Sequence, residues 1–123
     1  MALVLCTGPD PVLLETRRLI LQQAGHTVVS ALNIEQVILA CKQHVFDVAV
    51  IGQSVSPESK KVIASTVRRN CPSAKILELH QAHHGRTLAD ADSWLEVPAD
   101  VPQQLAERIA EMGIKKTGEQ TRT

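Results

Sequence analysis

Aromatic residues, net charge and long apolar runs are all scarce in this sequence. Phe46 and Trp94 are the only members of the Phe, Trp and Tyr group among 123 residues, so stacking of bases on aromatic side chains is not expected. Lys and Arg together number 13, as do Asp and Glu, and a balanced chain lacks the broad positive field that nucleic-acid binding uses. No apolar run approaches the ~18 residues of a membrane span. The expected partners therefore include neither nucleic acid nor membrane.

Cysteines are also few, and none belongs to a Cys-x-x-Cys pair. Cys6, Cys41 and Cys71 make an odd count and lie far apart in the sequence. We therefore expect three reduced thiols in a cytoplasmic protein. Residues 1–5 carry no basic segment ahead of an apolar stretch, so no signal peptide is predicted.

The length and composition of the chain fit one domain with its own core. Of its 123 residues 44% are hydrophobic and 21% are charged, which is ordinary for a globular protein. Residues 1–113 are predicted to form this domain. The polar residues 114–123 are predicted to be a disordered tail.

Short apolar runs alternate with segments of helical periodicity. The apolar runs predict strands at residues 3–6, 27–30, 47–51, 75–79 and 94–97. Capping residues followed by apolar stripes predict helices at 10–25, 33–41, 56–70 and 100–113, with at most a weak helix at 86–89. This alternation indicates an α/β domain: a doubly wound, five-stranded parallel sheet with helices on both faces.

Two charged residues fall where apolar side chains dominate. The stripe expected on the first helix contains one cation and consists of Leu13, Arg17, Ile20 and Ala24, broadened by Leu14 and Leu21. Glu78 lies mid-strand among apolar residues, where an unpaired charge is costly. We expect Glu78 to form an internal ion pair with Lys75 or an arginine. Poor coverage of this strand, or a cation supplied by a partner, are the alternatives.

The functional crevice of a doubly wound sheet lies at the carboxyl ends of its strands, where the strand order reverses. Here those ends are residues 6–9, 51–54 and 79–81. They contain no paired carboxylates, no nucleophile with a base and no glycine-rich phosphate loop. An enzyme is therefore the least expected function, and no cofactor is predicted.

Five stretches of the chain resemble receiver domains of two-component signalling and occur in the order of that family. They are residues 10–11, 23–28, 46–50, 75–80 and 90–98. The resemblance covers residues 2–112. It implies the (βα)5, flavodoxin-like fold with strand order 2-1-3-4-5, in a bacterial signalling protein.

The positions that carry the chemistry of receivers are changed in this chain. The acidic pair that holds Mg²⁺ matches Gly8 and Pro9, and the phosphate-accepting aspartate matches Gly52. The hydroxyl residue after the fourth strand matches His80, and the lysine before the fifth-strand proline matches Val97. Phosphoryl transfer needs charge neutralisation at the transferring group, and a hard cation needs oxygen ligands. The resemblance therefore indicates a degenerate pseudo-receiver that lacks the phosphorylation site.

Polar residues near these positions have simpler interpretations. Asp10 before Pro11 and Ser56 before Pro57 combine a capping side chain with a proline in the first turn, so both are predicted helix caps. Ser54 is interpreted as a loop serine. None of them is expected to replace the missing aspartate.

A histidine-rich loop follows the fourth strand. It contains His80, His83 and His84, with Cys6 and Thr7 expected opposite, and imidazole and thiolate are ligands of zinc or copper. No second ligand pair of defined spacing supports such a site. We therefore interpret the loop as polar and exposed, and predict that it binds no metal tightly.

The leading hypothesis for function is binding to another protein. The resemblance implies a phosphorylation-independent signalling module that contacts a protein partner, or a second copy of itself, through residues 86–112. Trp94, Glu96 and Leu105 are the candidate interaction face, since tryptophan is enriched among interface hot spots.

Two other hypotheses concern the crevice. A small-ligand sensor could use the space left at Gly8 and Gly52, with polar contacts from His80 and Gln53. A different doubly wound domain, binding cobalamin or a flavin, lacks support because neither an Asp-x-His-x-x-Gly motif nor a glycine-rich phosphate loop is present.

Overall fold

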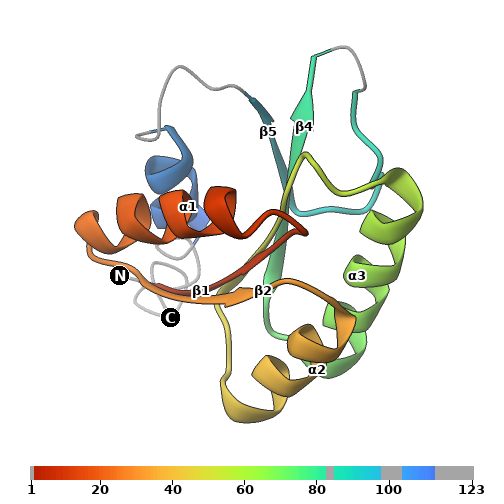
Figure 1. Ribbon diagram of the computed structural model, residues 1–123, viewed down its shortest axis with the longest axis horizontal. Coiled ribbons are helices and arrows are strands. Elements are labelled where there is room, and N and C mark those ends of the chain that lie inside the picture. The colour runs from red at the N-terminus through yellow and green to blue at the C-terminus, as the bar shows by residue number, and fades with distance from the viewer. Residues whose placement is uncertain (1, 83–84, 98–103, 113–123) are drawn as a thin grey trace, which may run out of the picture.

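The computed structural model describes residues 2–82, 85–97 and 104–112, which form three α/β/α layers (Figure 1). The elements in chain order are β1 (Leu3–Thr7), α1 (Pro11–Gln23), β2 (Thr27–Ala31), α2 (Ile34–Gln43), β3 (Val48–Ile51), α3 (Pro57–Asn70), β4 (Lys75–Gln81) and β5 (Ser93–Val97). Residues 104–112 form a further helical segment after them.

The five strands form one parallel sheet in the order β2-β1-β3-β4-β5. Helix α1 and residues 104–112 cover one face, while α2 and α3 cover the other (Figure 1). The prediction of a doubly wound, five-stranded sheet with order 2-1-3-4-5 is confirmed. The strand order reverses between β1 and β3, and this position is where such sheets place their functional crevice.

Helix starts are fixed by the capping residues that the sequence indicates. Asp10 Oδ1 accepts the N–H groups of Val12 and Leu13 at 3.0 and 3.2 Å. Ser56 Oγ accepts the N–H of Ser59 at 3.2 Å. Each cap satisfies N–H groups that the first turn leaves without an intrahelical partner, and a proline follows it. Asp10 and Ser56 are thus committed to the local backbone.

The core is aliphatic and divided by the sheet into two layers. All four residues of the central strand β3 are buried, as expected for a parallel strand covered on both faces. Phe46 is fully buried in the layer under α2 and α3, beside Leu5 and Ile76. The other layer joins α1 to residues 104–112 through side chains such as Leu21 and Ile109.

The buried side of α1 differs from the predicted stripe. Its buried residues are Leu14, Arg17 and Leu21. Leu13 and Ile20, by contrast, are only half-buried. The residues that were expected only to broaden the stripe are its centre, because the spacing i, i+3, i+7 selects a line slightly rotated around the helix. Arg17 lies in the middle of both the predicted stripe and the observed buried side of the helix.

The weak helix expected at residues 86–89 is absent from the structure. Glu78 Oε1 accepts the N–H of Leu88 at 2.8 Å, and Glu78 Oε2 accepts the N–H of Thr87 at 2.8 Å. The first turn of a helix also leaves its N–H groups free for such an acceptor, so these bonds fix the position of the segment against β4 and do not by themselves exclude a helix. Residues 85–88 have neither helical nor strand conformation.

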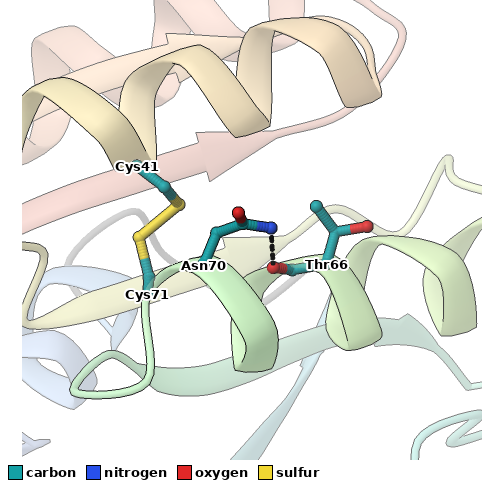
Figure 2. The surroundings of a disulfide bond; sticks show 4 residues. All are labelled: Cys41, Thr66, Asn70 and Cys71. Carbon is teal, nitrogen blue, oxygen red and sulfur yellow. Dashed lines mark hydrogen bonds between the residues drawn. A yellow bond between two sulfur atoms is a disulfide. The ribbon is translucent and has the colours of Figure 1, made fainter.

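The expectation of three reduced thiols is wrong for two of them. Cys41 and Cys71 form a disulfide that links the last turn of α2 to the residue after α3 (Figure 2). Only Cys6 is a free thiol, and it is buried. The two half-cystines are 30 residues apart in sequence, and the parallel packing of α2 and α3 under one face of the sheet brings them together.

Three predictions fall outside the described residues: the cap and end of the last helix at 100–103 and 113, the tail at 114–123, and His83 and His84. Within the described ranges, no helix has the length and hydropathy that crossing a bilayer requires.

Candidate functional site

The positions that match receiver chemistry gather at the carboxyl edge of the sheet. They are Gly8 and Pro9 after β1, Gly52 after β3, His80 in β4 and Val97 at the end of β5. The N–H of Gly52 donates to the carbonyl of Thr7 at 3.1 Å, which ties the β3 end to the β1 end. The structure thus brings these positions to one edge, as the parallel topology requires.

Arg17 occupies the space beside Gly52. This side chain is 6% exposed and reaches from α1 to the end of β3. A Cβ added at Gly52 would lie 3.0 Å from Arg17 Nη1 and 3.0 Å from the carbonyl oxygen of Thr7. Contacts this short are tighter than most Cβ contacts, so a side chain at this position would fit only if Arg17 and the Thr7 carbonyl moved by a few tenths of an ångström. The Arg17 guanidinium therefore occupies the space beside the position where receivers have their phosphate-accepting aspartate.

Two ionisable side chains, Arg17 and Cys6, are buried near the carboxyl ends of β1 and β3. Arg17 Nη2 donates a hydrogen bond to Gln53 Oε1. Burial lowers the pKa of Arg17, against the opposing effects of Cys6 and Asp10, but a guanidinium stays protonated in proteins. Burial raises the pKa of the Cys6 thiol to about 12, and the charge of Arg17 offsets this only in part. Cys6 is therefore neutral at pH 7 and is no nucleophile.

His80 holds the place of the receiver hydroxyl but makes no comparable contact. Its side chain is 9% exposed, and Nδ1 is buried without a hydrogen-bond partner among the described residues. The described residues also contain no group of three or more His, Cys, Asp or Glu side chains that could hold a metal. The other two histidines of the predicted loop lie outside these residues, so the prediction about metal binding stays a prediction.

A cavity of about 520 Å³ opens at the same edge, on the side of α2 and α3. Gly8 and Pro9 line it together with residues from the starts of α2 and α3. Gly52, Gln53 and His80 do not line it. The crevice expected from the sequence is thus divided: its Gly52 side is filled by Arg17, and its Gly8 side is open.

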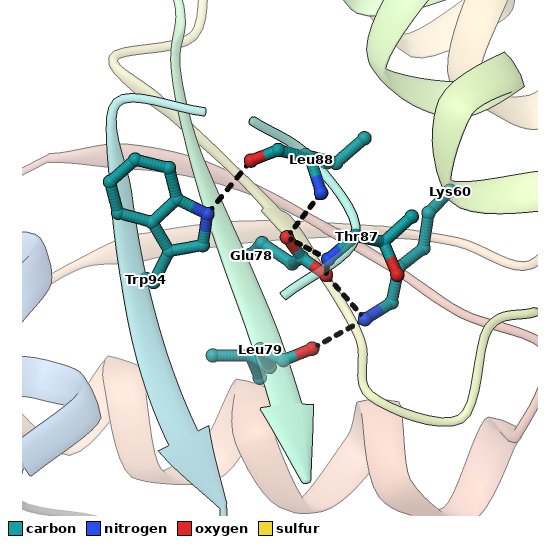
Figure 3. Close-up of polar contacts among 6 residues, drawn as sticks. All are labelled: Lys60, Glu78, Leu79, Thr87, Leu88 and Trp94. Carbon is teal, nitrogen blue, oxygen red and sulfur yellow. Dashed lines mark hydrogen bonds and ion pairs between the residues drawn. The ribbon is translucent and has the colours of Figure 1, made fainter. Parts of the chain in front are cut away.

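Next to this edge, Glu78 is the centre of a buried polar network (Figure 3). Lys60 Nζ lies 2.8 Å from Glu78 Oε2 and also donates to the carbonyl of Leu79. Burial alone would raise the pKa of Glu78, but the hydrogen bonds from Lys60, Leu88 and Thr87 outweigh it and hold the pKa below its ordinary value. The expected internal ion pair exists, but its cation is Lys60 and neither Lys75 nor an arginine.

The three residues of the candidate interaction face lie in different surroundings. Trp94 is half-buried against the α3 layer, donates from Nε1 to the Leu88 carbonyl at 2.8 Å, and carries the Arg86 guanidinium 4.6 Å above its ring. Glu96 is exposed. Leu105 is 7% exposed and packs in the opposite layer. Glu96 and one side of Trp94 are therefore accessible, whereas Leu105 supports the core.

Sequence reasoning gave no site role to Arg17 and did not single out Lys60. Both carry the same signal, a cation on the buried line of a helix: Arg17 between Leu14 and Leu21, and Lys60 three and four residues before Ile63 and Ala64. Periodicity shows that such a residue points inward. It does not show which strand end lies opposite.

Comparisons with known proteins concern the fold alone. No protein-family model matches the sequence, and no curated protein matches it significantly. Solved structures do match: a response regulator receiver domain protein from Clostridium thermocellum has 18% identity and a TM-score of 0.80, covering 95% of this chain and 98% of that one. This chain has the receiver fold.

Two further structures support the same conclusion. A CheY-like receiver domain protein from Methanospirillum hungatei has 17% identity and a TM-score of 0.78, covering 97% of this chain and 98% of that one. The response regulator TrrA from Thermotoga maritima, solved in complex with Mg(2+)-BeF, has 20% identity and a TM-score of 0.74, covering 91% and 99%. At these identities the receiver fold is shared, while the site has to be judged from its own residues.

Proposed function

We propose that this chain is a receiver-like signalling module that works without phosphorylation, by binding another protein. The observation that carries the proposal is the buried Arg17 guanidinium beside Gly52, which crowds the position where a receiver has its aspartate. A receiver needs an aspartate there, and it holds Mg²⁺ with side-chain carboxylates that Gly8 and Pro9 do not have. The chain is a degenerate pseudo-receiver in this proposal, and it catalyses no reaction.

The proposed setting is the cytoplasm of a bacterium, with a signalling protein or a second copy of the chain as the partner. A Cys41–Cys71 bond that stays oxidised in the cell would count against this location, since stable disulfides are rare in the cytosol. Trapping of thiols in intact cells, followed by mass spectrometry, tests the location separately from the function.

Phosphorylation is tested with acetyl phosphate and Mg²⁺, with intact mass as the readout and the Thermotoga maritima receiver as the positive control. We expect no stoichiometric gain of a phosphoryl group. Gly52→Asp should not restore uptake, because Gly8 and Pro9 still lack carboxylates and Arg17 would pair with the new aspartate. A Mg²⁺-dependent, one-to-one mass gain in the natural chain would overturn the proposal.

Protein binding is tested on the exposed charges of the final third of the chain. Glu96 in β5 and Glu107 in the last helical segment are both exposed, and Glu35 at the start of α2 is an exposed matched control. Glu96→Lys or Glu107→Lys should weaken self-association in light scattering or capture of a cross-linked partner, and Glu35→Lys should not. A monomer at high concentration, with partner capture unaffected by all three changes, would contradict the proposal.

A further inference from the structure

The open half of the crevice has the dimensions and position of a small-molecule site. Its volume of about 520 Å³ lies within the range of roughly 300–1,000 Å³ that such pockets occupy. It lies outside the carboxyl ends of β1 and β2, next to the reversal of strand order between β1 and β3. Ligands of doubly wound sheets bind at this place for topological reasons.

The walls of this cavity are aliphatic and come from two helices and the loops before them. They are formed by Leu32, Ile34 and Val37 on the α2 side and by Val55, Val62 and Ile63 on the α3 side. Leu32 and Val62 are 40% and 52% exposed, so two large apolar side chains of the lining face solvent. Covering them would remove apolar surface from water, which favours an occupant that is itself largely apolar.

The polar groups of the cavity are few and uncharged. Asn33, Ser56 and Ser59 line it. Asn33 Oδ1 and Ser56 Oγ accept N–H groups of their helices, so Asn33 Nδ2 and the Ser56 hydroxyl hydrogen can donate to a ligand, while the Ser59 hydroxyl can donate or accept. No Asp, Glu, Lys, Arg or His belongs to its described lining. The N-termini of α2 and α3 contribute only partial positive charge, and Asn33 and Ser56 already accept one of their first N–H groups each. With no full charge in the lining, a phosphate, a nucleotide or a divalent cation would lose hydration here without gaining an ion pair, so an uncharged ligand is favoured.

We propose that this cavity binds a small, uncharged, largely apolar molecule with one or two hydrogen-bonding groups. The apolar body would lie between α2 and α3, and its polar groups would face Asn33, Ser56 and Ser59. This proposal does not rest on the protein-binding function, because it concerns the opposite end of the sheet from β5. It also moves the ligand site away from Gly52 and His80, where the sequence alone had placed part of it.

The probe for the test is N-phenyl-1-naphthylamine, a neutral molecule that fluoresces in apolar surroundings. Its anionic relative, 1-anilinonaphthalene-8-sulfonate, has a similar ring system and is the charge control. The purified chain should bind the neutral probe at one saturable site, and the anionic probe about tenfold more weakly or worse. Absence of saturable binding, or a preference for the anionic probe, would overturn the proposal.

Two serine substitutions on α3 locate the site. Ser59 lines the cavity and is exposed, so Ser59→Phe should fill the space and weaken binding of the neutral probe by about tenfold or more. Ser65 is exposed on the same helix but does not line the cavity, so Ser65→Phe should leave the affinity unchanged. Equal affinity in both variants, or equal loss in both, would contradict the site.

Measurements on the natural chain keep the test independent of the variants. The neutral probe should shift the backbone amide resonances of Gly8, Asn33 and Ser59, and leave that of Glu96 in place. Shifts confined to other residues would overturn the proposal. Probe binding that disappears as the protein concentration rises would show that a second copy of the chain fills the cavity, and would overturn it as well.

Discussion

Lys60 and Glu78 face one another across the interface of α3 and β4, with Nζ 2.8 Å from Oε2 and side chains that are 4% and 0% exposed. Each charge has a second kind of partner: Lys60 donates to the carbonyl of Leu79, while Glu78 accepts the N–H groups of Thr87 and Leu88 (Figure 3). The pair therefore anchors the segment that joins β4 to β5.

Removing one partner of this pair should be strongly destabilising. Lys60→Met leaves the Glu78 carboxylate buried without its cation, and we expect the free energy of unfolding at pH 7 to fall by about 3–5 kcal/mol. Urea denaturation measures the change. Lys61→Met, at an exposed position one residue along α3, is the control and should change stability by less than about 0.5 kcal/mol. Equal stability of the two variants would contradict the role of the pair.

The ion pair of Lys60 and Glu78 should also make the free energy of unfolding depend on pH. The pKa of Glu78 is held below its ordinary value because the hydrogen bonds from Lys60, Leu88 and Thr87 outweigh burial. A lowered folded-state pKa gives stability that is fully present above the unfolded-state pKa of about 4.3, and that is lost as pH falls through the folded-state pKa. The stability gap between the natural chain and Lys60→Met should therefore narrow below about pH 4. An unchanged gap would contradict this assignment.

The sequence predicted the sheet better than it predicted the contacts between distant elements. Apolar runs and capping residues located every strand and three helices, because these signals are local. The ion pair of Glu78 was expected from burial cost alone, but its cation lies 18 residues away on α3, and only the packing of α3 against β4 identifies Lys60.

The predictions for residues 86–89 and for the cysteines were wrong for the same reason, because both depend on contacts between distant elements. Local propensity allowed a weak helix there, but the segment is irregular and is held against β4 by the bonds from the N–H groups of Thr87 and Leu88 to Glu78. Cys41 and Cys71 show no spacing motif, and their Cα atoms come within 5.6 Å only once α2 and α3 pack side by side. In the candidate site, the four lost charges at Gly8, Pro9, Gly52 and Val97 could be seen in the sequence, whereas the position of the Arg17 side chain beside Gly52 could not be predicted.

A side chain at position 52 should destabilise the protein. Gly52→Ala places a Cβ 3.0 Å from Arg17 Nη1, which can move, and 3.0 Å from the backbone oxygen of Thr7, which cannot move cheaply. We expect a loss of about 1–3 kcal/mol in the free energy of unfolding, as for other overpacked sites. Adding Arg17→Met to Gly52→Ala should recover only part of the loss, because Thr7 is still in place. Ser54→Ala, in the exposed part of the same loop, should be nearly neutral.

Cys6 should resist alkylation in the folded protein. Burial raises the pKa of its thiol to about 12, so almost none of it is thiolate at pH 8, and the side chain is 0% exposed. Iodoacetamide at pH 8 should label the native chain slowly, and label one thiol rapidly after unfolding in urea without a reductant. Rapid labelling of the native chain would show that Cys6 is more accessible than its place in β1 implies.

The Cys41–Cys71 bond should be a main contributor to stability, because it closes a loop of 30 residues that includes β3 and the whole of α3. The loss of chain entropy in the unfolded state corresponds to about 3–4 kcal/mol for a loop of this length. Dithiothreitol should therefore lower the urea midpoint of the natural chain, and Cys41→Ala with Cys71→Ala should lower it similarly while abolishing the effect of the reductant. Asn70→Ala, which removes only the hydrogen bond from Asn70 Nδ2 to the Thr66 carbonyl beside the bond, should keep the reductant effect (Figure 2). A natural chain with the same midpoint in the presence and absence of the reductant would show that the two sulfurs are not bonded in solution.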